Sequence, residues 1–186
     1  VYEKGRRLAL GASATTVHWI NGSAWFALGE AHGLLWAFDA LYVVVNGAGE
    51  FTSGLYRVCD TDGDDALDQI ECLRKLDGDG EHGPHGLVLD ASGEALLLVA
   101  GNYTHLPEPM ARYRRPHNWA EDALLPVIPD PNGHAVEIRA PGGWVARTDR
   151  DGKEGELVAA GFRNAYDLAV NEDGEVFTYD SDMEWD

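Results

Sequence analysis

Basic residues and long apolar runs are scarce in this chain, and each shortage excludes a class of function. Lys and Arg number 14 against 32 Asp and Glu, which gives a formal net charge of −18 at pH 7. Such a chain repels phosphate backbones, so nucleic acid is not expected as a partner. No apolar run approaches the roughly 20 residues of a membrane helix. With 186 residues and 45% hydrophobic content, the chain can bury one ordinary core.

Cysteine is also rare. The chain has only Cys59 and Cys72, one on each side of an acidic segment. A hairpin that closes this segment would bring the thiols together, and a disulfide there would stabilise the fold by about 3 kcal/mol. Two free, partly buried thiols fit the pattern equally well. The sequence has no Cys-x-x-Cys-His motif, so this chain itself attaches no haem covalently.

Helical periodicity is nearly absent, whereas short strand-like runs are frequent. Gly, Asn and Asp turns separate these runs, as in β-rich proteins. The clearest runs are residues 41–45, 55–58, 87–89, 95–100, 144–146 and 175–179. The sequence therefore predicts an all-β fold.

Two parts of the chain repeat each other 81 residues apart, with Leu87-Val-Leu-Asp-Ala-Ser-Gly-Glu94 echoed by Leu168-Ala-Val-Asn-Glu-Asp-Gly-Glu175. The repeat divides the chain into modules at about residues 33–76, 80–161 and 165–186, the last of them incomplete. Four short strands in a period of about 40–50 residues are typical of a β-propeller blade. Closed propellers need about four to eight blades. We therefore expect residues 1–186 to be a partial β-propeller, part of one domain whose remaining blades lie in a longer protein.

A Pro-rich insertion, residues 103–141, interrupts the second module. Its prolines are too dense for a helix or a central strand. We expect a long loop outside the sheets, of the kind that is often functional.

An acidic segment follows Cys59 and carries carboxylates at positions 1, 3, 5, 9 and 12 of a calcium loop of the EF-hand type. These residues are Asp60, Asp62, Asp64, Asp68 and Glu71. However, Asp65 stands where the loop needs glycine, and no helical pattern flanks it. A solvated hairpin turn is the alternative, and the shorter turn Asp149-Arg-Asp-Gly152 favours it.

His82 and His85 stand in a turn framed by Gly and Pro, directly before the strand-like run at 87–89. A neutral imidazole there could act as a general base. A zinc site would need further ligands, and none stands at a recognisable spacing. A structural role, with the rings bonded to backbone, is the third interpretation.

Arg163 and Asn164 stand before the third module as His82 stands before the second, so we expect all of them at one face. A guanidinium binds carboxylates through two parallel hydrogen bonds, and the Asn amide adds a donor and an acceptor. The pair would suit an anionic planar cofactor or substrate. An ion pair between Arg163 and one of the chain's own carboxylates is the alternative.

These motifs together resemble a known family. They are Gly80-Glu-His-Gly-Pro-His85 before Gly86-Leu-Val-Leu-Asp-Ala-Ser-Gly93, then Gly101-Asn102, Pro141-Gly-Gly143, and Gly161-Phe-Arg-Asn164 through to Tyr179-Asp-Ser-Asp-Met-Glu-Trp-Asp186. The chain is similar over most of its length to the six-bladed propellers of quinoprotein glucose/sorbosone dehydrogenases. The closest resemblance is to related membrane-bound dehydrogenases of planctomycete-type bacteria.

The resemblance implies an exported bacterial dehydrogenase, periplasmic or extracellular, that is membrane-associated through regions outside this chain. It would oxidise a sugar or alcohol hydroxyl with pyrroloquinoline quinone and calcium. His82 matches the family's base, His85 lies beside it, and Arg163 and Asn164 match residues that contact the quinone. The alternative is a non-catalytic propeller that serves as a binding module beside a haem domain elsewhere in the longer protein.

Overall fold

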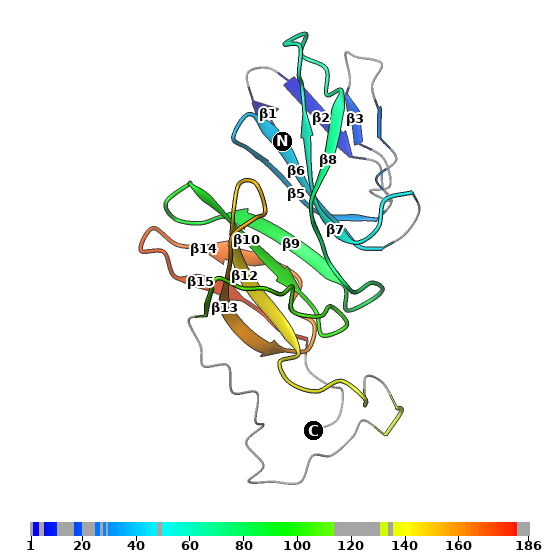
Figure 1. The fold of residues 1–186 in the computed structure, drawn as a ribbon, viewed down its shortest axis with the longest axis vertical. Coiled ribbons are helices and arrows are strands. Elements are labelled where there is room, and N and C mark those ends of the chain that lie inside the picture. Colours follow the sequence, from blue (N-terminus) through cyan, green and yellow to red (C-terminus); the bar gives the residue numbers. More distant parts are fainter. Residues whose placement is uncertain are drawn as a thin grey trace.

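The computed structural model is all-β, with no helix in any segment it describes (Figure 1). It describes residues 2–3, 6–10, 17–19, 25–26, 28, 30–47, 50–113, 131–133 and 136–181. Over these residues there is accordingly no helix long and apolar enough to cross a membrane. The all-β class predicted from the scarcity of helical periodicity is confirmed.

The strands form four sheets. The first contains β1 (Tyr2–Glu3), β2 (Arg6–Leu10), β3 (Val17–Trp19) and β4 (Trp25–Phe26). The second contains β5 (Ala31–Ala37), β6 (Ala40–Val45), β7 (Gly54–Cys59) and β8 (Gln69–Lys75). The third contains β9 (Pro84–Leu89), β10 (Ala95–Ala100), β12 (Gly143–Asp149), β13 (Gly155–Phe162) and the short β11 (Arg112–Tyr113). The fourth is the hairpin of β14 (Leu168–Val170) and β15 (Val176–Thr178).

Three of the sheets are antiparallel meanders, in which each strand pairs with the next one along the chain. In the third sheet β9, β10, β12 and β13 are antiparallel neighbours in that order, while β11, which comes between β10 and β12 in the sequence, pairs with β13 in parallel at the edge. All six runs predicted as strands overlap strands of these sheets. Such meanders form locally because short turns link strands whose residues alternate between two packed faces.

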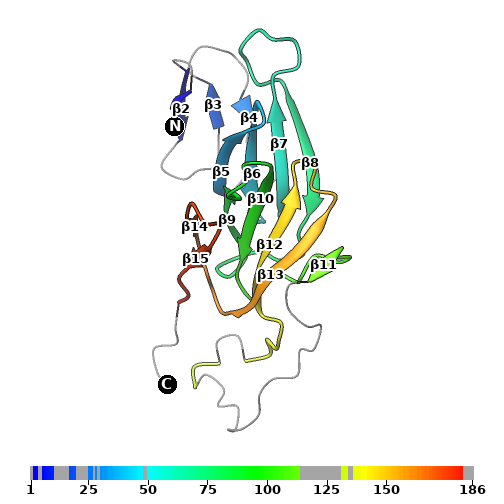
Figure 2. The ribbon, with the colours of Figure 1, turned by 90° about the vertical axis from the view of Figure 1, so that its left-hand side faces the viewer.

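The first strands of the second, third and fourth sheets lie next to one another: β5 lies beside β9, and β14 lies against β9 (Figure 2). Glycine permits both approaches. A Cβ on Gly33 would lie 2.7 Å from the carbonyl oxygen of His85, and one on Gly86 would lie 2.9 Å from a carboxylate oxygen of Asp167. Successive sheets therefore meet backbone to backbone.

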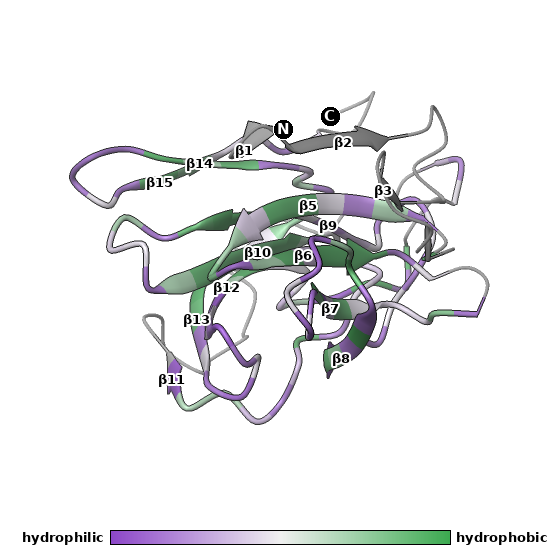
Figure 3. Ribbon diagram, turned by 90° about the horizontal axis from the view of Figure 1, so that it is seen from above, coloured by the Kyte–Doolittle hydropathy of each residue, from purple (hydrophilic) through white to green (hydrophobic). Residues whose placement is uncertain are grey.

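Apolar side chains from the second and third sheets form the largest cluster of the core, and β6 and β10 run through it as hydrophobic strands (Figure 3). Tyr42, Leu55, Leu98 and Trp144 are among its buried members. Burying a side chain of this size stabilises the fold by about 1.5–3 kcal/mol. The phenol of Tyr42 also donates across the sheets to the carbonyl of Arg150, at 2.9 Å. The two sheets are thus packed as one unit.

The Pro-rich insertion begins against this core, and the expectation that it lies wholly outside the sheets is wrong, because its residues 112–113 add a short strand to the third sheet. The indole nitrogen of Trp144 donates to the carbonyl of Thr104 at 3.0 Å, and β11 lies beside β13. Residues 114–130 and 134–135 of the insertion lie outside the described residues, as do residues 182–186 of the third predicted module.

Candidate functional site

Three rings from three sheets meet at the start of the neighbouring strands β5, β9 and β14. They belong to His32, His85 and Tyr166 and are termed the ring cluster. The ring centroids of His85 and Tyr166 lie 4.3 Å apart, those of His32 and His85 5.3 Å, and those of His32 and Tyr166 5.7 Å. The cluster forms because each ring stands two residues before a leucine of its strand, and these strands lie side by side.

A chain of hydrogen bonds runs through the two imidazoles. Nδ1 of His32 lies 3.1 Å from Nδ1 of His85, and Nε2 of His85 lies 2.8 Å from Oδ1 of Asn164. An amide oxygen only accepts hydrogen bonds, so Nε2 of His85 carries the hydrogen and its Nδ1 presents a lone pair to His32.

Burial keeps both imidazoles of the cluster neutral at pH 7. The side chain of His85 is completely buried, and this lowers its pKa from 6.5 to about 4, against the opposing effect of the hydrogen bond to Asn164. His32 is half-buried; burial lowers its pKa as well, and the nearby Glu30 carboxylate opposes this. Desolvation disfavours the charged form of an imidazole, which explains both directions.

His82, which the resemblance makes the base, is also completely buried. Its Nδ1 lies 2.7 Å from Oδ1 of Asn102, and its ring lies on Tyr103 with centroids 4.5 Å apart. The backbone N–H of Asn102 donates to the carbonyl of Arg163 at 2.8 Å. The structure therefore brings His82 and Arg163 to the same end of the sheets but encloses the His82 ring.

Arg163 and Asn164 are held by one carboxylate. Their backbone N–H groups donate to the two oxygens of Asp180, each at 2.7 Å. The guanidinium of Arg163, a half-buried residue, donates to the hydroxyl of Ser181 at 3.0 Å. The carboxylate thus fixes the backbone from which the Asn164 side chain reaches His85.

Of the four residues predicted here, His85 and Asn164 touch, while His82 and Arg163 connect through Asn102. Sequence reasoning missed His32 and Tyr166. A signal for His32 was present, because His32-Gly-Leu repeats His85-Gly-Leu in the preceding module. Nothing in the residue type of Tyr166 indicated a site; only its place in the repeat did.

The acidic segment forms a separate, exposed loop. Asp60, Asp62 and Asp64 each present one carboxylate oxygen, and these oxygens lie within 4.8 Å of one another. Asp60 accepts from the N–H groups of Gly63 and Asp65 at 2.7 and 2.8 Å. Asp65 adopts a φ of 73°, the left-handed conformation for which a calcium loop uses glycine at this position.

The two remaining carboxylates of the predicted calcium set have other partners. Asp68 accepts from the hydroxyl of Thr61 at 2.7 Å, and Glu71, on β8, forms an ion pair with Arg57 at 2.8 Å. The structure therefore brings together three of the five carboxylates.

Cys59 and Cys72 are free thiols. Across the β7–β8 ladder Cys59 faces Gln69, whereas Cys72 faces Tyr56. The two cysteines therefore lie at different positions along the β7–β8 ladder and do not face each other, so they form no disulfide.

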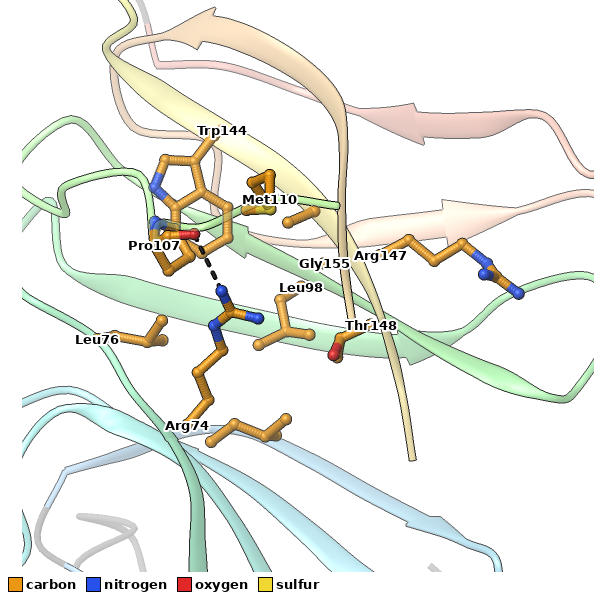
Figure 4. Close-up of a pocket in the computed structure, with 11 residues that line it drawn as sticks. Arg74, Leu76, Leu98, Pro107, Met110, Trp144, Arg147, Thr148 and Gly155 are labelled. Carbon is orange, nitrogen blue, oxygen red and sulfur yellow. Dashed lines mark hydrogen bonds between the residues drawn. The ribbon is translucent and has the colours of Figure 1, made fainter. Parts of the chain in front are cut away.

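A small cavity lies away from the ring cluster, between the second and third sheets (Figure 4). Leu55, Leu98 and Trp144 line it, and Arg74 points across it to donate to the carbonyls of Pro107 and Pro109 at 3.0 and 3.2 Å. Its free volume of about 20 Å³ is room for about one water molecule. The cavity is a packing gap under the insertion and is too small for a sugar.

Comparison with protein-family models and with curated proteins gives no match. The family resemblance therefore depends on the motifs of the sequence alone.

Proposed function

We propose that this chain is part of a β-propeller in which the successive sheets are blades, and that the propeller is a quinoprotein-type dehydrogenase. The order of the strands supports the architecture, since the first strands of the second, third and fourth sheets lie side by side and neighbouring strands in these sheets are joined in simple antiparallel order, apart from β11. In a propeller these are the strands that line the central channel. The described sheets would be part of such a ring.

One observation carries the proposed site: His85 of β9 and Asn164, which precedes β14, hydrogen-bond at 2.8 Å although 79 residues separate them. This contact joins the two repeats that sequence analysis assigned to one site. Arg163, the residue before Asn164, is half-buried, and its guanidinium donates to the hydroxyl of Ser181 at 3.0 Å. A site with a cation, an amide and neutral imidazoles at the channel end of two blades suits an anionic planar cofactor.

Pyrroloquinoline quinone carries carboxylates, and the positive charge of Arg163 is complementary to them. Within the described segments the only hydrogen bond of the Arg163 guanidinium is to the Ser181 hydroxyl, so its other N–H groups can hold a cofactor carboxylate. The amide Nδ2 of Asn164 can donate to the cofactor as well. When bound, the quinone would accept hydride from a sugar or alcohol. His82 would have to leave Asn102 and Tyr103 to reach a substrate hydroxyl.

Turnover of the longer, complete protein tests this proposal. Loaded with the quinone and given a dye acceptor, it should oxidise a sugar or alcohol, and Arg163→Ala should reduce kcat/KM by about 10²-fold. Arg112→Ala is the matched control, because this arginine lies on the exposed strand β11. Export to the periplasm or the cell exterior belongs to the same proposal.

A binding module without catalysis is the second candidate, and the complete burial of His82 and His85 favours it. Enclosed, amide-bonded imidazoles can serve to fix the geometry of a blade. Under this proposal the propeller would act beside a haem domain in the longer protein. Absence of turnover with any quinone, in a complete and folded protein, would select it.

A further inference from the structure

His32 has one ring nitrogen that the hydrogen-bond chain does not use. Its Nδ1 faces His85, whereas its Nε2 has no hydrogen-bond partner among the described residues. It is also not one of the buried, unpartnered side-chain atoms, which are Oδ1 of Asn46, Oγ of Ser53 and Oγ1 of Thr104. A fully buried nitrogen without a partner would belong to that group, so Nε2 of His32 keeps some contact with solvent.

The hydrogen-bond chain sets which nitrogen of His32 carries its proton. Because Asn164 takes the Nε2 hydrogen of His85, Nδ1 of His85 is an acceptor, and the hydrogen between the two imidazoles belongs to His32. Nδ2 of Asn46 lies 3.3 Å from the same nitrogen and gives one of its two hydrogens to the carbonyl of Gly80 at 2.7 Å; the contact with His85, at 3.1 Å, is the shorter of the two at Nδ1 of His32 and needs the hydrogen of His32. Neutral His32 then holds a hydrogen on Nδ1 and a lone pair on Nε2.

The surroundings keep this lone pair available. The titratable groups that act on His32 or on its partner His85 are Glu30, His82, Tyr166 and the two imidazoles themselves. Burial lowers the pKa of His32, so its neutral form dominates at pH 7, while Glu30 would stabilise the imidazolium after proton uptake. Tyr166, which is 43% exposed, has its ring centroid 5.7 Å from that of His32.

We propose that His32, through Nε2, is the proton acceptor of this site, and that His85 and Asn164 are positioning residues that hold its proton on Nδ1. A general base oriented by a hydrogen bond to its other nitrogen is the usual arrangement for an imidazole that takes a proton from a hydroxyl. The hydroxyl proton passes to Nε2, and the imidazolium keeps its Nδ1 hydrogen bond to His85. This inference takes its substrate, a sugar or alcohol hydroxyl, from the proposed function, but its geometry is independent of it.

Nitrogen-15 NMR of the histidine rings in this chain tests the proposal directly, since it distinguishes protonated from unprotonated ring nitrogens. At pH 7 we expect hydrogen on Nδ1 of His32 and on Nε2 of His85. Lowering the pH should protonate Nε2 of His32 before His85 takes up a second proton. A His32 ring with its hydrogen on Nε2 at pH 7 would overturn the proposal.

Asn164→Asp tests the relay, because a carboxylate on Nε2 of His85 should make the Nδ1 of His85 a stronger acceptor. We expect the pKa of His32 to rise by about one unit. Asn102→Asp is the matched control: it makes the same change beside His82, outside the chain that reaches His32. Equal increases in both variants would show a through-space charge effect alone and would contradict the positioning role.

Activity separates this inference from the proposed function. If the ring nitrogens are as expected but the complete protein oxidises nothing, the dehydrogenase proposal fails and the assignment of His32 as an available base stands. If the complete protein is active and His32→Gln keeps full kcat while its fold is intact, His32 is not the proton acceptor.

Discussion

The ring cluster, of which the sequence pointed only to His85, and the acidic loop are two groups of ionisable side chains that are built in opposite ways. Rings from three different sheets meet in the cluster, where His85 is completely buried. The carboxylates of Asp60, Asp62 and Asp64 come from one short loop, and those of Asp62 and Asp64 are exposed to solvent. The cluster therefore depends on the fold, while the loop depends on local hydrogen bonds.

Because of this difference, protonation of a group in the ring cluster and protonation of a group in the acidic loop should change the free energy of unfolding by different amounts. A buried imidazole cannot exchange its protein contacts for water, so its protonation is linked to folding. Exposed carboxylates keep their hydration and contribute little to stability. Substitutions in the ring cluster should therefore change the free energy of unfolding more than substitutions in the acidic loop.

Acid should produce the largest effect, through His85. Its pKa is about 4 in the folded chain against 6.5 as its ordinary value, so the unfolded state binds more protons between these pH values. The stability due to neutral His85 is complete above about pH 6.5 and is lost as the pH falls to about 4, a change of about 3 kcal/mol. Urea unfolding at pH 7, 5.5 and 4 measures it.

His85→Gln is the control for this pH dependence, because glutamine keeps an amide for hydrogen bonding and does not titrate. Between pH 6.5 and 4, the free energy of unfolding of this variant should fall less steeply with decreasing pH than that of the original chain. Asp62→Asn, in the exposed loop, should leave the free energy of unfolding at pH 7 within about 0.5 kcal/mol of the original. If the free energy of unfolding depended on pH equally in the original chain and in His85→Gln, the claim that burial of His85 links its protonation to folding would be contradicted.

Crowding the contact between β5 and β9 should produce the next largest effect. In Gly33→Ala the new Cβ would lie 2.7 Å from the carbonyl oxygen of His85, so the strands must separate, at a cost of about 2 kcal/mol. Gly63→Asn is the control in the loop. It has open space and a φ of +80°, which asparagine tolerates, so we expect a loss of only about 0.5 kcal/mol. Thermal or urea unfolding compares the two, and equal losses would show that β5 and β9 are not in close contact.

Calcium should produce the smallest effect, through the carboxylates of the acidic loop. If Asp60, Asp62 and Asp64 hold the ion, calcium at ten times its dissociation constant should raise the free energy of unfolding by about 1.4 kcal/mol. Asp62→Asn should abolish this increase, whereas Glu71→Gln should keep it because Glu71 is paired with Arg57. If calcium does not stabilise the original chain, the hairpin interpretation holds. If Glu71→Gln loses the stabilisation by calcium, Glu71 is a ligand and the predicted set of five carboxylates is favoured instead.

Local patterns were enough to predict the all-β class and the strands at 95–100 and 144–146, because alternating or continuous apolar residues between turn residues determine them. Residues with a local motif were found in the same way, including His82, His85 and Asn164. The repeat of His-Gly-Leu marks His32 in the sequence, but its contact with His85 crosses between sheets and follows only from the packing of β5 beside β9. The enclosure of His82 and the pairing of Glu71 with Arg57 also depend on tertiary packing that spacing along the chain does not reveal.

The central claim is that the first strands of three successive sheets bring His32, His85 and Tyr166 into contact. Nuclear Overhauser effects between the ring protons of these residues measure this most directly in solution. With ring centroids 4.3 Å apart, His85 and Tyr166 should give strong cross-peaks, and His32 should give cross-peaks to both rings. Cross-peaks from His85 to Tyr166 but none from His32 to either ring would contradict the meeting of β5 and β9, and with it the shared site.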